Sequence, residues 1–170
     1  MLSYKELFRL GSDFQTYVEL GSDEDIKSVS DIRTQCVNEL PRSTLEKLNE
    51  IEKDIHILVA GDVSCSDCRL NLTALHHMSL IQPKIKYSII SKECAEQHIL
   101  KYLEFQQIKI PLMLILDSNF KLTQLFVERP LAVNSVGDFD EIKEAYLGGK
   151  YLTDTMNEIL NKFDEQHSFY

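Results

Sequence analysis

The sequence predicts an α/β fold in which short buried strands alternate with helices. Three apolar runs, at 55–60, 85–90 and 112–116, have the length and composition of buried strands. Apolar residues recur at helical spacing between these runs, and a short turn after the third run leads into an alternating segment at 121–127. The order from residue 55 is therefore β-α-β-α-β-β-α, with a central mixed sheet of about four strands.

The helices expected around these strands follow from spacing and end signals. Helices are predicted over 69–80 and 93–105, so the first two strands should be parallel neighbours joined by a right-handed crossover. Two more helices are expected near the end of the chain. Asp138 and Glu141 should cap the first, which Gly148-Gly149 ends, and the second carries apolar residues over 152–163.

The first 43 residues predict a helical extension that precedes the main domain, residues 44–170. Gly11 and Gly21 divide the beginning of the extension into short helices, and a longer helical pattern runs over 26–40. Pro41 ends that pattern. Ser43 and Glu46 then have the spacing of a capping box that opens the next helix. The apolar stripes show that the extension buries a surface, against either the sheet or a second copy of the chain.

Composition excludes several classes of function. The 170 residues are 44% hydrophobic and 26% charged, and the formal net charge is -9. An acidic chain is poorly suited to nucleic acid or to anionic membranes. No stretch approaches the roughly 20 apolar residues of a membrane span, and the start lacks the apolar core of a signal peptide. A cytoplasmic location is therefore expected, with no nucleic-acid or membrane partner.

A CxxC motif, Cys65-Ser66-Asp67-Cys68, lies between the first predicted strand and its helix. Thiol–disulfide exchange needs a thiolate nucleophile and a second thiol that resolves the mixed disulfide. Because a helix N-terminus stabilises negative charge, Cys65 is the predicted attacking thiol and Cys68 the resolving thiol. Ser66, Asp67 and the preceding Asp62 should modulate the pair.

The nearby charges predict a moderate thiol. The carboxylates of Asp62 and Asp67 disfavour a thiolate on Cys65, and Arg69 offers partial compensation. We therefore expect Cys65 to be less acidic than the reactive thiol of a strongly oxidising exchange protein.

Taken together, these features resemble the thioredoxin fold over about residues 44–165. The CxxC ends the first strand, and Ile110-Pro111 precedes the third strand, 43 positions after Cys68. The resemblance implies a cis bond before Pro111 and a role for the Ile110 backbone in binding an extended substrate segment. It also implies a thiol-disulfide oxidoreductase that acts on protein or low-molecular-weight disulfides, with a dithiol reductase as a further candidate partner. No bound cofactor is implied, because the cysteines carry the electrons.

The sequence departs from a standard thioredoxin at several positions. Ser64 stands where the family usually has tryptophan, and Ser66-Asp67 replaces Gly-Pro. Val59 stands where the family has a buried aspartate that moves a proton for the second cysteine. Asp62 or water is expected to take over that role. The helical extension replaces the family's first strand, so the chain resembles the divergent bacterial thioredoxin-like proteins.

Topology adds one more candidate residue. The fourth strand must return to the end of the sheet where the third begins, so Glu128-Arg129-Pro130 should line the same groove as Cys65 and Pro111. Arg129 is predicted to bind a substrate carboxylate or to support the thiolate, and a solvated surface arginine is the alternative.

Two other readings of the CxxC stay open. The first is a redox-inactive binding module on a thioredoxin fold, which the departures at Val59 and Ser64 favour. The second is a zinc site, which needs further ligands from His76, His77 or Cys94. Their spacing does not fit, so no metal is expected, and Cys36 and Cys94 are predicted to be apolar fillers.

Overall fold

The computed structural model describes residues 1–38 and 40–164, so residues 165–170 of the predicted main domain lie outside the described part. Helices and strands alternate from residue 55 onward, as predicted. The elements are α1 (Tyr4–Leu10), α2 (Phe14–Glu19), α3 (Asp23–Val37), α4 (Arg42–Asn49), β1 (Ile55–Ala60), α5 (Ser66–Ile81), β2 (Ile85–Ile90), α6 (Lys92–His98), β3 (Leu112–Leu116), β4 (Leu122–Val127), α7 (Leu131–Asn134), the 3-10 helix η1 (Phe139–Glu141), α8 (Lys143–Leu147) and α9 (Leu152–Asp164).

The strands form one mixed sheet with the order β2-β1-β3-β4. β1 and β2 are parallel, as the crossover rule predicts, and Val59 is opposite Ile89. β3 lies antiparallel to both β1 and β4. This arrangement confirms the predicted α/β class. It also brings the end of β1, the start of β3 and the end of β4 to the same end of the sheet.

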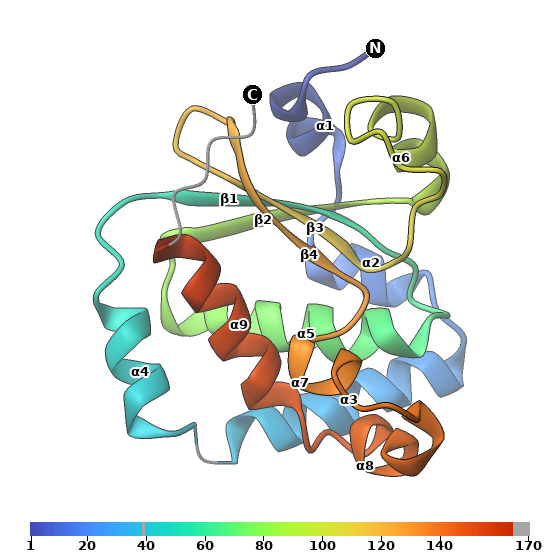
Figure 1. Ribbon diagram of the computed structural model, residues 1–170, viewed down its shortest axis with the longest axis vertical. Coiled ribbons are helices and arrows are strands. Elements are labelled where there is room, and N and C mark those ends of the chain that lie inside the picture. The colour runs from blue at the N-terminus through green and yellow to red at the C-terminus, as the bar shows by residue number, and fades with distance from the viewer. Residues whose placement is uncertain (39, 165–170) are drawn as a thin grey trace.

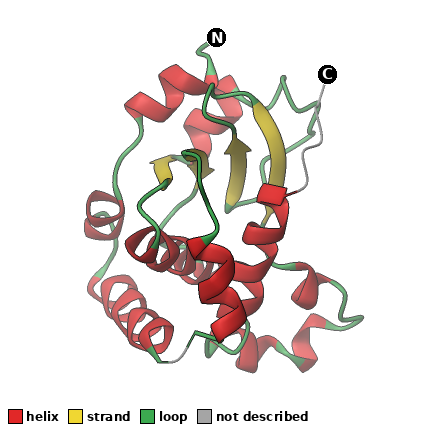
Figure 2. Ribbon diagram, turned by 90° about the vertical axis from the view of Figure 1, so that its left-hand side faces the viewer, coloured by secondary structure: helices red, strands yellow, loops and turns green. Residues whose placement is uncertain are grey.

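Helices cover both faces of the sheet. Ile57 and Val59 of β1 point into a core shared with α3, α5 and α9, whereas Leu58 and Ala60 point into a second core under α1 and α6. Figures 1 and 2 show the strands between these two layers, with α1 and α6 above the sheet and the remaining helices below it. Alternate residues of one strand therefore serve two separate hydrophobic cores.

The N-terminal extension lies along the β2 edge. Ser12 exchanges two backbone hydrogen bonds with Ile89, with N···O distances of 2.8 and 2.9 Å. On either side of this bridge the chain passes to opposite faces: Leu7 of α1 is buried in one core, and Val29 and Ile32 of α3 are buried in the other. The extension therefore covers an edge that would otherwise expose unpaired backbone groups.

Several predicted helix ends are wrong. The helix predicted over 93–105 ends at His98, because Ile99 turns into the core with no exposed surface. The capping box at Ser43 does not form: α4 has Pro41 at its N-cap, and Glu46 instead pairs with Arg42 at 2.8 Å. The helix predicted from Asp138 is divided into η1 and α8, with Asp138 capping the 3-10 turn. α5 begins at Ser66, three residues before its predicted start.

Candidate active site

The two motif cysteines occupy the first turn of α5. Cys65 is the N-cap residue and is half-buried, and Cys68 has no exposed surface. The thiols are free, as are those of Cys36 and Cys94. Gly61 directly follows β1, and a Cβ atom there would lie 3.6 Å from the Cys68 Sγ, so the backbone after the strand packs directly against the buried thiol. The helix start thus presents one accessible and one enclosed sulfur.

The loop before Cys65 is held by Asp62. Its carboxylate accepts hydrogen bonds from the Ser64 backbone N–H at 2.9 Å and from the Ser64 hydroxyl at 2.8 Å. Its own backbone N–H donates to the Cys68 Sγ at 3.5 Å. Asp62 therefore contacts Cys68 through the backbone, while its carboxylate shapes the loop. The predicted proton transfer by this carboxylate stays a prediction.

The turn at Ile110-Pro111 faces the accessible thiol. The Ile110–Pro111 peptide bond is cis. The Cys65 Sγ lies 3.9 Å from the Ile110 carbonyl oxygen, and the Pro111 carbonyl accepts the Glu128 N–H at 2.8 Å. The turn before β3 therefore contacts both Cys65 and the residue that follows β4.

Arg129 lies at the same end of the sheet and binds Asp67 of the motif. Its Nε donates to Asp67 Oδ1 at 2.9 Å, and its Nη2 donates to Asp67 Oδ2 at 3.3 Å. Its guanidinium also lies 3.8 Å from the centre of the Phe139 ring. The alternative of a solvated surface arginine is therefore wrong. The predicted roles toward a substrate carboxylate or the thiolate stay predictions.

A buried polar network continues from Asp67 into the helices. The Tyr146 hydroxyl donates to Asp67 Oδ1 at 2.7 Å, and Asn71 Nδ2 donates to the Tyr146 oxygen at 3.1 Å. The Thr155 hydroxyl donates to Asn71 Oδ1 at 2.7 Å. Asn71, Tyr146 and Thr155 were not predicted as site residues. The signal in the sequence was Asn71, a polar residue inside the apolar helix pattern, since a buried amide needs partners.

Arg69 stabilises the loop from the other side. Its guanidinium pairs with Asp25 of α3 at 2.9 Å and donates to the backbone oxygens of Val63 and Ser64 at 2.9 and 3.0 Å. Arg69 therefore ties α3 to the loop before Cys65. Arg69 was expected to offset the carboxylates that disfavour a thiolate on Cys65. Its guanidinium instead binds Asp25 and the loop carbonyls.

The surroundings of the two thiols separate their acidities. A hydrogen bond from the Cys68 side chain lowers the pKa of Cys65 to about 7, against the effects of burial and of the Asp67 charge. The backbone N–H groups of Cys68 and Asp67 also lower this pKa. The hydrogen bond to Cys65 and burial both raise the pKa of Cys68 well above its ordinary value. Cys65 is thus the thiol that ionises near neutral pH, and Cys68 holds its proton.

We expect alkylation of reduced Cys65 to follow a pKa near 7. The thiolate reacts and the thiol does not, so the rate should rise about tenfold between pH 6 and pH 8. Cys94 is an internal control, because burial and Glu93 raise its pKa. Iodoacetamide labelling resolved by peptide mass spectrometry measures both residues in one sample. A Cys65 rate that tracks the Cys94 rate across this range would contradict the assignment.

A tyrosine that was not predicted lies near the thiol pair. Tyr17 of α2 is 3% exposed, and its hydroxyl has no hydrogen-bond partner among the described residues. Burial, then the charges of Cys68 and Cys65, raise the pKa of Tyr17. The turn after α2 packs against the loop before Cys65, since a Cβ atom on Gly21 would lie 3.2 Å from Val63 Cγ1. The phenol therefore stays protonated beside the site.

His76, one of the residues considered as a zinc ligand, has other partners. His76 Nδ1 lies 2.7 Å from the Tyr87 hydroxyl, and its ring stacks on Phe14 with centroids 4.1 Å apart. Across residues 1–38 and 40–164, no group of three or more His, Cys, Asp or Glu side chains is arranged to hold a metal ion.

In the same part of the chain, every helix is too short or too polar to cross a bilayer.

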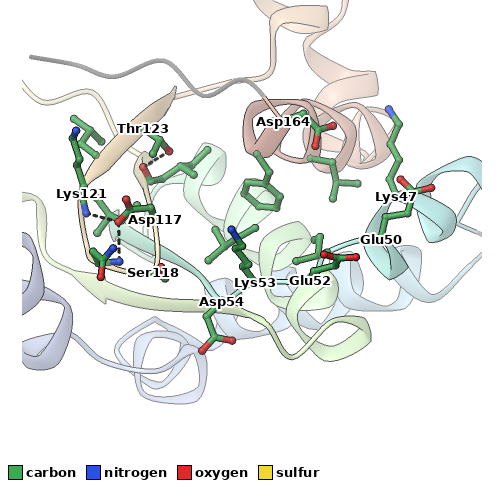
Figure 3. A pocket seen from close by; sticks show the side chains of 18 residues that line it. Lys47, Glu50, Glu52, Lys53, Asp54, Asp117, Ser118, Lys121, Thr123 and Asp164 are labelled. Atoms are coloured by element: carbon green, nitrogen blue, oxygen red, sulfur yellow. Dashed lines mark hydrogen bonds between the residues drawn. The ribbon is translucent and has the colours of Figure 1, made fainter.

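A cavity of about 610 Å³ lies at the opposite end of the sheet, where β1 begins and β3 ends. Figure 3 shows carboxylates and lysines around its rim, among them Lys47, Glu50, Lys53, Asp54 and Asp164. Its described lining contains no cysteine or histidine. The cavity therefore has no part in thiol chemistry at Cys65.

Comparison with known proteins points to one family. A family model described as thioredoxin matches residues 11–143. A protein of unknown function from Pseudomonas aeruginosa, with a 1.5 Å crystal structure, is 39% identical with a TM-score of 0.93, and the match covers 96% of this chain and 98% of that one. An HIV epitope-scaffold is 40% identical with a TM-score of 0.91 and the same coverage. No curated protein matches the sequence significantly.

Proposed function

This chain belongs to the thioredoxin family, and from that premise we propose that it is a thiol–disulfide oxidoreductase that uses Cys65 and Cys68. The observation that carries the proposal is the position of Cys65. Its sulfur is accessible at the N-terminus of α5 and lies 3.9 Å from the Ile110 carbonyl, beside the cis proline. Its pKa of about 7 supplies thiolate at neutral pH.

The proposed reaction moves two electrons in two steps. The Cys65 thiolate attacks one sulfur of the substrate disulfide, forms a mixed disulfide, and expels the other substrate sulfur as a thiolate. Cys68 then loses its proton and attacks the Cys65 sulfur, which forms the Cys65–Cys68 disulfide and releases the remaining substrate thiolate. The substrate gains two electrons, and its two thiolates take up protons. A dithiol reductant returns the pair to the thiol state.

The second step needs help with a buried proton. Cys68 has no exposed surface, and Val59, at the place of the family's acid, is also fully buried. The backbone N–H of Asp62 donates to the Cys68 sulfur and lowers its pKa, which stabilises the thiolate that forms there. We therefore assign to Asp62 the modulating role, exerted through its backbone.

The partners in this proposal are chemical classes. The substrate is a protein or low-molecular-weight disulfide, with Ile110 and Pro111 as the docking turn. The electron donor is a dithiol reductase. The cysteines carry the electrons without a bound cofactor. A reducing compartment such as the cytoplasm suits a chain whose cysteines, all four in the described part, are free thiols.

Equilibration in graded dithiothreitol buffers tests the proposal. After free thiols are trapped, mass spectrometry should find a Cys65–Cys68 disulfide that forms in one two-electron transition. A midpoint of roughly -270 mV is expected, since a thiol with a pKa near 7 is typical of a reductant, and strong oxidants lie near -120 mV. If no disulfide joins these residues in any buffer, the activity is absent. The chain is then a redox-inactive binding module, the reading that Val59 favours.

A further inference from the structure

Asp67 is a charged residue inside the CxxC motif, and it is nearly enclosed. The residue is 9% exposed and lies between the two cysteines on the first turn of α5. A carboxylate at this position opposes ionisation of Cys65, by an amount that depends on the distance and direction of its charge. The place where the carboxylate is held therefore bears on the reactivity of the thiol.

Two side chains from outside the motif hold this carboxylate. Arg129, which follows β4, donates to both oxygens, and Tyr146 of α8 donates to Oδ1 at 2.7 Å. The Phe139 ring centre lies 3.8 Å from the guanidinium carbon, a cation–π contact that further restrains Arg129. A two-point ion pair and a phenol hydrogen bond leave the carboxylate little freedom to turn.

The backbone after β4 is shaped for this contact. Glu128 has a φ of 64°, which is a strained, left-handed conformation for a residue other than glycine. Its N–H donates to the Pro111 carbonyl at 2.8 Å, and its own carbonyl accepts Asn71 Nδ2 at 3.1 Å. Two hydrogen bonds thus hold a strained residue immediately before Arg129 and direct the chain toward Asp67.

The charged and titratable groups around Asp67 come from several elements. Cys65 and Cys68 share its helical turn, Arg129 follows β4, and Tyr146 belongs to α8. Beside Arg129, the Glu128 carboxylate pairs with Lys109 at 3.8 Å. In this set, Arg129 and Tyr146 are the groups in direct contact with the Asp67 carboxylate.

We propose that Tyr146 and Arg129 are positioning residues that hold the Asp67 carboxylate in one place, and that this placement sets how readily Cys65 reacts. The segment from Glu128 to Leu147 thereby sets the reactivity of the motif from outside it. The biological role of this positioning rests on the proposed exchange activity, because that activity uses the Cys65 thiolate. Its test needs only the reduced protein and an alkylating reagent.

Tyr146→Phe is the sharpest variant, because it removes the phenol hydrogen bond to Asp67, together with the one accepted from Asn71, without changing any charge at neutral pH. We expect the alkylation rate of Cys65 at pH 6 to fall about two- to fivefold, because the loosened carboxylate disfavours the thiolate. In an Asp67→Asn background, Tyr146→Phe should have almost no effect on this rate. Arg129→Met should follow the same pattern with a larger decrease. Such a double-mutant cycle isolates the coupling through Asp67.

Thr155→Val is the matched structural control. Thr155 is 1% exposed and lies two hydrogen bonds farther along the same network, through Asn71. It should lower stability while leaving the pH profile of Cys65 alkylation unchanged. Equal effects of Tyr146→Phe with and without the Asp67 carboxylate would overturn the proposal, as would an unchanged profile in a folded Tyr146→Phe protein. Failure of the redox titration would instead remove the proposed activity and leave this coupling measurable.

Discussion

We expect Cys65→Ser to reduce thiol–disulfide exchange to the background rate of the buffer. The Cys65 sulfur is the accessible nucleophile of the pair, and a serine hydroxyl does not ionise at neutral pH. Cys68 cannot replace it, because Cys68 has no exposed surface. The rate is measured with a small aromatic disulfide whose released thiolate absorbs visible light.

Changing Cys68 should separate the two steps of the reaction. Cys68→Ala retains the first attack, so it should accumulate a one-to-one mixed disulfide at Cys65, visible as a mass increase of the intact protein. Alanine is preferred to serine here, since a hydroxyl at a fully buried position needs a partner. Cys94→Ser is the control for a half-exposed thiol elsewhere and should keep full turnover. Loss of turnover in that variant, with Cys65→Ser still active, would contradict the assigned roles.

The strands could be predicted from the sequence because burial on both faces gives them an unmistakable composition. β1, β2 and β3 have the bounds expected from their apolar runs. Helix ends were less predictable, since they depend on contacts made elsewhere in the fold. The helical pattern continues past His98, but Ile99 is fully buried in the core between α6 and the sheet and the chain turns there. Tertiary packing thus overrides a local propensity.

The candidate site was predictable where its residues have local signatures or follow from topology. The CxxC and Ile110-Pro111 are sequence motifs. The position of Arg129 could be predicted because β4 returns to the end of the sheet where β3 begins. Tyr146 and Thr155 have no such signature, because they reach Asp67 and Asn71 from 79 and 84 residues away in sequence. The left-handed Glu128 was also unpredictable, since its strain is supported by distant hydrogen bonds.

The N-terminal extension raises a question that the predicted boundary at residue 43 leaves open, namely whether it folds as part of the main domain. Its contribution is divided between two cores: Leu7 packs in one of them and Val29 in the other. The chain crosses from one face to the other at the Ser12–Ile89 bridge, at the β2 edge. An element that completes both cores should unfold together with the sheet, in a single transition.

Gly11→Val should therefore destabilise the whole protein, by about 2–3 kcal/mol. Valine tolerates the Gly11 backbone, with φ of -68° and ψ of 167°, so the cause is space. An added Cβ would clash with the Ser88 hydroxyl and lie 3.0 Å from the Ile89 carbonyl oxygen. Relieving these contacts moves Ser12 away from Ile89, its partner in the bridge. Gly137→Val is the control, since nothing lies within 4 Å of a Cβ there. Urea unfolding followed by circular dichroism should show one transition at a lower midpoint for Gly11→Val and an unchanged midpoint for the control. Two separate transitions would show instead that the extension is an independent unit, and an unchanged midpoint for Gly11→Val would mean that the bridge does not hold it to the sheet.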